Sequence, residues 1–65
     1  MQLKSLLTSR EAAEYIGYSE YSLRASRMGR TLGGHEPPEH IKIGRTVRYR
    51  LSDLDSWIQE VSHHG

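Results

Sequence analysis

The chain of 65 residues contains no cysteine and no phenylalanine, and its only prolines are the adjacent Pro37 and Pro38. Without cysteine, neither a disulfide framework nor a cysteine-ligated zinc site can support so small a core. No apolar run approaches the roughly 20 residues of a membrane-spanning helix, and no signal-peptide pattern opens the sequence. We therefore expect a cytoplasmic protein without membrane contact, folded as one domain.

The net charge of +1 conceals an uneven distribution along the chain. Residues 21–50 carry seven basic and two acidic side chains, a net charge of +5, whereas the remaining residues carry two basic and six acidic side chains, a net charge of −4. The seven basic residues are Arg24, Arg27, Arg30, Lys42, Arg45, Arg48 and Arg50. This pattern indicates a surface that faces a polyanion, although an ordinary solvated surface is the alternative.

Two short helices are predicted in the first half of the chain. Thr8 and Glu11 have the spacing of a capping box, which predicts a helix from Ser9 to Ile16 that Gly17 ends. Ser19 is the next candidate N-cap, and it predicts a second helix from Glu20 to about Met28, closed by Gly29. The short turn between them, Gly17-Tyr18-Ser19, is typical of a helix-turn-helix pair.

Residues 41–50, IKIGRTVRYR, predict a β-hairpin with an apolar and a cationic face. A two-residue turn at Gly44-Arg45 would place Ile41 opposite Arg48. We favour a three-residue turn, Gly44-Arg45-Thr46, because it brings apolar residues together on one face. The pairs this register predicts are Ile43 with Val47, Ile41 with Tyr49, and Lys42 with Arg48.

A loop is predicted for residues 30–40, and a last helix is predicted from Asp53 to Val61 with Ser52 as its N-cap. The expected core consists of Leu7, Ala12, Ala13, Ile16, Leu23, Ile41, Ile43, Val47, Tyr49, Leu54, Trp57, Ile58 and Val61. These elements predict an α+β fold, a winged helix-turn-helix of three short helices with a two-stranded hairpin wing. The domain is expected to span residues 6–61, with flexible tails at 1–5 and 62–65.

The candidate DNA-binding residues fall on the second helix and the hairpin. With Leu23 pointing inward, Tyr21 points outward and is flanked by Ser22 and Arg24, and this arginine suits a guanine edge or a phosphate. Arg27 lies near the core edge, where a phosphate contact and a salt bridge to Glu20 or Glu14 are equal alternatives. The candidate residues of the hairpin are Lys42, Arg45, Arg48 and Arg50. Thr8 and Ser9 place exposed N–H groups at the start of the first helix, where either a phosphate or capping alone explains them.

Catalysis and metal binding have little support in the sequence. Four histidines are present, but none forms a helical i, i+4 pair and none has a cysteine partner. We find no plausible pair of nucleophile and base and no glycine-rich phosphate loop. We therefore expect neither an enzyme nor a bound cofactor or metal.

Three segments together resemble the excisionase and AlpA-like family of small phage and mobile-element regulators, which share the MerR-type winged-helix fold. The most specific are residues 8–13, the Gly44-Arg45-x-Val47-Arg48-Tyr49 segment, and Asp53-Leu54-Asp55-x-Trp57-Ile58. The similarity extends over about residues 6–61. Many relatives carry a large apolar residue where Ser26 stands, so the resemblance implies a more loosely packed second helix here.

The resemblance implies that the second helix enters the major groove while the hairpin contacts the minor groove or the backbone. By the same resemblance Ser22 and Arg24 fall on recognition positions, and Arg45 and Arg48 fall on wing positions. It further implies a sequence-specific protein that organises DNA for a phage integrase, regulates a promoter, or does both. The sequence shows no dimerisation helix, so we expect a monomer that binds double-stranded DNA cooperatively. A module that docks on an integrase or polymerase through Tyr21 and Met28, without DNA contact, is the alternative.

Overall fold

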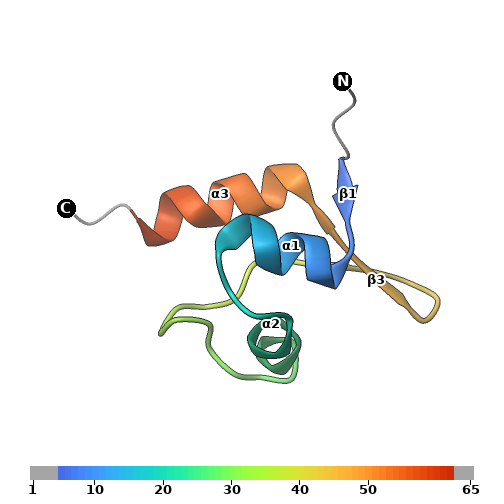
Figure 1. Ribbon diagram of the computed structural model, residues 1–65, viewed down its shortest axis with the longest axis horizontal. Coiled ribbons are helices and arrows are strands. Elements are labelled where there is room, and N and C mark those ends of the chain that lie inside the picture. Colours follow the sequence, from blue (N-terminus) through green and yellow to red (C-terminus); the bar gives the residue numbers. More distant parts are fainter. Residues whose placement is uncertain (1–4, 63–65) are drawn as a thin grey trace.

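The computed structural model describes residues 5–62 of the chain. Its elements follow in the order β1 (Leu6–Leu7), α1 (Ser9–Ile16), α2 (Glu20–Ser26), β2 (Ile41–Ile43), β3 (Thr46–Arg50) and α3 (Leu51–Val61). In Figure 1, α3 lies above α1 and α2 lies below it, while the β2–β3 hairpin projects to the right. This arrangement confirms the predicted α+β, winged helix-turn-helix fold. Most of each predicted tail, residues 1–4 and 63–65, lies outside the described residues.

The capping signals predicted α1 correctly. The Glu11 N–H donates to the Thr8 hydroxyl at 3.1 Å, and the Thr8 N–H donates to the Glu11 carboxylate at 2.9 Å. Gly17 ends the helix with a φ of 84°, in the left-handed region that a glycine adopts without strain. The turn to α2 therefore begins where the sequence placed it.

α2 ends two residues before the predicted Met28. Its start is as predicted, because the Ser22 N–H donates to the Ser19 hydroxyl at 3.1 Å. After Ser26 the backbone tightens, since the N–H groups of Arg27 and Met28 donate to carbonyls three residues back, at 3.1 and 3.0 Å. Gly29 thus ends a tighter turn that follows the α-helix.

The predicted two-stranded hairpin is present as β2–β3, and a third strand, β1, which was not predicted, joins it in an antiparallel sheet of order β1-β3-β2. Leu7 pairs with Tyr49, and Leu6 pairs with Arg50. Two residues are too few to show an alternating pattern, which is why β1 escaped the sequence analysis. Its pairing makes β3 the central strand, and Tyr49 is completely buried there.

The predicted hairpin register is also wrong. The observed pairs are Ile41 with Arg48, Lys42 with Val47, and Ile43 with Thr46, so the turn has two residues, Gly44 and Arg45. Gly44 has a φ of 63°, the geometry that a tight hairpin turn needs at its first central position. Near the tip the hairpin extends beyond the core, and Ile43 is 56% exposed. Burial therefore does not set the register there, and the turn geometry does.

α3 begins at Leu51, directly after β3, and not at Asp53 as predicted. Arg50 occupies the N-cap position without a side-chain hydrogen bond, and Ser52 lies inside the first turn. The Leu51 N–H instead donates to the Ser5 carbonyl at 2.9 Å. A backbone contact from the chain just before β1 thus satisfies the first N–H of α3, and the predicted cap by Ser52 is wrong.

The buried core includes a leucine that the sequence analysis placed in a loop. Its members are Leu7, Ala12, Ala13, Leu23, Leu32, Tyr49, Leu54 and Trp57, with Ile16, Val47, Leu51, Ile58 and Val61 packed against them. Leu32 reaches the core because it opens a tight turn with His35, in which Gly33 and Gly34 both have positive φ. The predicted core position of Ile43 is wrong, since that side chain is exposed.

Trp57 fastens the 30–40 loop to the helices. Its indole Nε1–H donates to the Glu36 carbonyl at 2.6 Å, and its ring meets the Tyr18 ring edge-on at 6.2 Å between centroids. A Cβ at Gly33 would overlap the Tyr18 hydroxyl, so the loop backbone lies directly against that ring. A separate contact joins α1 to α3, where the Tyr15 hydroxyl donates to Asp55 at 2.6 Å and this bond raises the pKa of Tyr15.

We expect Trp57→Ala to lower the free energy of unfolding by about 3–5 kcal/mol, because the substitution empties a central core position. Trp57→Phe is the matched control, since it keeps an aromatic ring and loses the indole hydrogen bond, at a cost of about 1–2 kcal/mol. Urea titration followed by circular dichroism measures both values. A loss below about 1 kcal/mol for the alanine variant would show that the core does not depend on Trp57.

Candidate nucleic-acid interface

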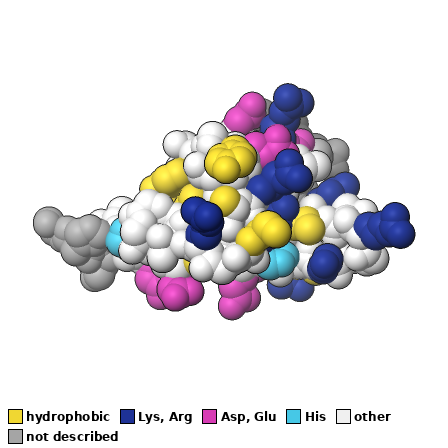
Figure 2. All heavy atoms as spheres, turned by 90° about the horizontal axis from the view of Figure 1, so that it is seen from below, with side chains coloured by type: hydrophobic (Ala, Val, Ile, Leu, Met, Phe, Trp, Pro, Cys, Tyr) yellow, Lys and Arg dark blue, Asp and Glu magenta, His cyan; other side chains and the backbone are white. Residues whose placement is uncertain are grey.

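The predicted site residues lie in two parts of the molecule. Tyr21, Ser22, Arg24 and Arg27 come from α2 and its end, and Lys42, Arg45, Arg48 and Arg50 come from the hairpin. Figure 2 views the molecule from below, the side on which α2 lies in Figure 1. Lys and Arg side chains gather toward the hairpin end of this view, with hydrophobic side chains between them.

Tyr21 and Arg24 on the outward face of α2, and Met28 in the tight turn after it, are all exposed. Leu23 and Ser26 are buried on the opposite face, and the Ser26 hydroxyl donates to the Leu23 carbonyl at 2.6 Å. The helix therefore turns one narrow side to the core. This burial of Ser26 gives no sign of the loose packing that the resemblance implied.

Ser22 is tied to the start of its own helix. Its hydroxyl accepts a hydrogen bond from the Ser19 hydroxyl at 2.9 Å, and its N–H donates back to Ser19 at 3.1 Å. The side chain is half-buried. Contact between Ser22 and a base stays a prediction, and Arg24 is the more exposed of the two candidate readers.

Arg27 connects three elements from the C-cap of α2. One guanidinium nitrogen, Nη1, donates to the Ser9 hydroxyl of α1 and to the Tyr49 hydroxyl of β3, each at 3.0 Å. The guanidinium also lies 5.8 Å from the centre of the Tyr49 ring, within the range of a cation–π contact. From the sequence, a phosphate contact and a salt bridge were equal alternatives for Arg27, and this hydrogen-bond network was not predicted. The residue in the sequence that could have indicated this network is Tyr49, because a buried tyrosine hydroxyl needs a hydrogen-bond partner.

The hairpin cations do not share one face. In the observed register Arg48 lies beside Ile41 on the outer face, whereas Lys42 lies beside Val47 on the opposite face, and Arg45 occupies the tip. The predicted like-charge pair of Lys42 with Arg48 is therefore wrong. Positive charge surrounds the projecting hairpin on both faces and at its tip, which suits an element that enters a groove between two phosphate backbones.

Two of the hairpin arginines also make contacts within the protein. Arg48 Nη1 donates to the Val47 carbonyl at 2.8 Å, and Arg50 Nη1 lies 3.7 Å from the Asp53 carboxylate. A partly exposed ion pair such as Arg50 with Asp53 contributes little to stability, so the Arg50 side chain remains available to an anion at small cost. Lys42 and Arg45 are exposed to solvent.

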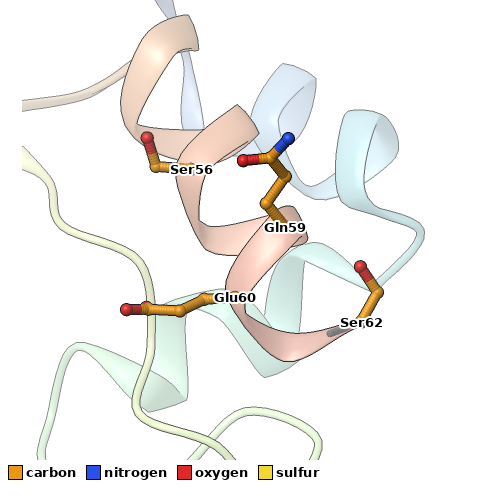
Figure 3. A pocket seen from close by; sticks show the side chains of 4 residues that line it. All are labelled: Ser56, Gln59, Glu60 and Ser62. Atoms are coloured by element: carbon orange, nitrogen blue, oxygen red, sulfur yellow. The ribbon is translucent and has the colours of Figure 1, made fainter. Parts of the chain in front are cut away.

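A shallow hollow along α3 has no basic side chain in its lining, unlike the surface of α2 and the hairpin. It is lined by Ser56, Gln59, Glu60 and Ser62, whose side chains leave the helix in different directions (Figure 3). Within residues 5–62, no three histidine or acidic side chains come close enough to hold a metal ion. No helix in that part of the chain is long and apolar enough to cross a membrane.

The Arg27–Tyr49 contact can be measured by a double-mutant cycle. Arg27→Met keeps the alkyl stem, and Tyr49→Phe removes only the hydroxyl. We expect a coupling free energy of about 1–2 kcal/mol from urea unfolding, because the bond involves a charged donor and a buried acceptor. Arg24→Met is the control and should change stability by less than about 0.5 kcal/mol. Additive effects of the two substitutions would contradict the role of this contact.

Comparison with known proteins identifies the family of the chain. No curated protein matches the chain. The family model described as a helix-turn-helix domain matches residues 6–62, which includes every element from β1 to α3. Because the match covers nearly the whole chain, the protein belongs to the helix-turn-helix domain family, a family of small DNA-binding domains.

Proposed function

We propose that this protein binds double-stranded DNA sequence-specifically, with α2 in the major groove and the hairpin against the adjoining minor groove or backbone. The observation that carries the proposal is the pairing of an exposed helix face, at Tyr21 and Arg24, with a projecting cationic hairpin. Arg27 links the end of α2 to β3 through the Tyr49 hydroxyl. We assign different roles to the hairpin and to α2, because phosphate contacts position a protein on DNA and base contacts select the site.

More specifically, we propose that the protein is a small regulator of the excisionase and AlpA-like type, which acts beside a phage integrase or at a promoter. The size of the molecule supports cooperative binding. Its longest dimension is 34 Å, which is about one turn of duplex DNA. One copy thus contacts few base pairs, and useful selectivity requires several copies on adjacent sites or a partner protein. We propose a monomer in solution that assembles on DNA.

The salt dependence of duplex binding tests the proposal. If the four hairpin cations, Lys42, Arg45, Arg48 and Arg50, each neutralise a phosphate, the slope of log K against log salt should be about −3 to −4. Fluorescence anisotropy with a labelled 30-base-pair duplex, titrated at several KCl concentrations, measures this slope. A flat slope, or no binding at low salt, would contradict the proposal and favour the protein-docking module suggested by the exposure of Tyr21 and Met28.

Two arginine variants separate the hairpin from the rest of the surface. Arg45→Ala should make the slope less steep by about one and weaken binding to all duplexes alike, because a phosphate contact carries no sequence information. Arg10→Ala is the matched control, since it removes the same charge from an exposed position on α1. Equal effects of the two variants would show that net charge matters and that the hairpin has no special contact.

A further inference from the structure

The most exposed large apolar side chains among the described residues are one on α2 and one in the tight turn that follows it. Tyr21 and Met28 are each 81% exposed, whereas the next such residue, Ile43, is 56% exposed. Arg24 lies between them in sequence and is exposed as well. Large apolar groups left in water on a proposed binding surface indicate an apolar contact in the bound state.

The three side chains form a line along the helix. Their spacing of i, i+3 and i+7 places them on one face, because an α-helix turns once in 3.6 residues. Met28 belongs to the tight turn after α2, and its N–H donates to the Ala25 carbonyl at 3.0 Å, so the chain still winds in the helical direction there. The line from Tyr21 to Met28 is about 10 Å long, which corresponds to about three base pairs.

The major groove offers one partner for each kind of side chain. Guanine presents two acceptors, N7 and O6, which fit the forked donors of an arginine, while the 5-methyl group of thymine is the apolar feature of the base edges. We propose that α2 reads thymine methyl groups on both sides of a guanine, with Tyr21 and Met28 packed on the methyls and Arg24 bonded to the guanine. This inference rests on the DNA-binding function proposed above.

Charge favours DNA over a protein as the occupant of this face. Tyr21, Ala25 and Met28 have the apolar spacing of a helix that docks in a groove, but Arg24 lies on the same face, and an apolar protein groove would leave its charge unpaired. The neighbouring hairpin adds Lys42, Arg45 and Arg48, so the surroundings of the face are positive. A polyanion with apolar groups in its groove complements both properties at once.

The test begins with a site selected from a random duplex library by the wild-type protein. Each thymine in that site is then replaced singly by deoxyuridine, which removes the 5-methyl group and keeps base pairing. We expect about a fourfold loss of affinity, the value for one methyl-sized apolar contact, at two positions that flank an essential guanine. An enriched site without this pattern, or unchanged affinity for every uracil duplex, would overturn the inference and leave the proposed DNA binding intact. Failure to enrich any site, or to bind duplex at all, would overturn both.

Variants assign each methyl to its side chain. Met28→Gln keeps length and helix propensity, and it should abolish the thymine–uracil difference at one position only. Tyr21→Gln should abolish the difference at the other position. Ile43→Gln is the matched control, because it removes an exposed apolar side chain outside α2 and should preserve both differences. If Met28→Gln and Tyr21→Gln retain full discrimination, these residues do not read the methyl groups. Thermal melting checks that all three variants fold.

Discussion

The Tyr49 hydroxyl and the Arg27 guanidinium form the contact on which the rest of this structure depends. Tyr49 lies on the central strand and is completely buried, so its hydroxyl must find a partner inside the protein. Arg27 provides it from the end of α2 and bonds Ser9 of α1 with the same nitrogen. One charged group therefore joins the sheet and both helices of the helix-turn-helix. It adds to the packing of α2 on α1, where Leu23 is buried in the core.

A domain of this size depends on such shared contacts because its apolar core is small. The core has eight buried apolar residues, and two of them are alanines. Polar contacts add stability that the burial of these small apolar side chains does not provide. The Ser5 carbonyl accepts a hydrogen bond from the Leu51 N–H at the start of α3, and the Glu36 carbonyl accepts one from the Trp57 indole N–H. Each of these bonds also ties a segment without regular structure to a helix, so the connecting chain contributes to the stability of the elements it connects.

Local signals predicted most of the fold, and long-range contacts account for what they missed. The capping box at Thr8, the left-handed Gly17 and the Ser19 cap lie within a few residues of the groups they satisfy, so the sequence reveals them. The strand at Leu6 arises from pairing with Arg50, a partner distant in sequence, and the tight turn from Leu32 to His35 lies inside a segment that the sequence predicted only as a loop. For the site, spacing alone placed Tyr21 and Arg24 on the exposed face of α2. It misplaced Lys42, because at the projecting tip turn geometry sets the register, and it missed the internal role of Arg27.

Because of its position, Trp57 is an intrinsic fluorescent probe of this fold. This is the only tryptophan, and its ring is nearly buried between Tyr18, the loop that carries Glu36 and the core. Indole emission shifts with the polarity of its surroundings, so detachment of the loop would alter the fluorescence even while the helices persist. Local opening and global unfolding are thus distinguishable in the unmodified protein, by comparing emission with helical signal during denaturation.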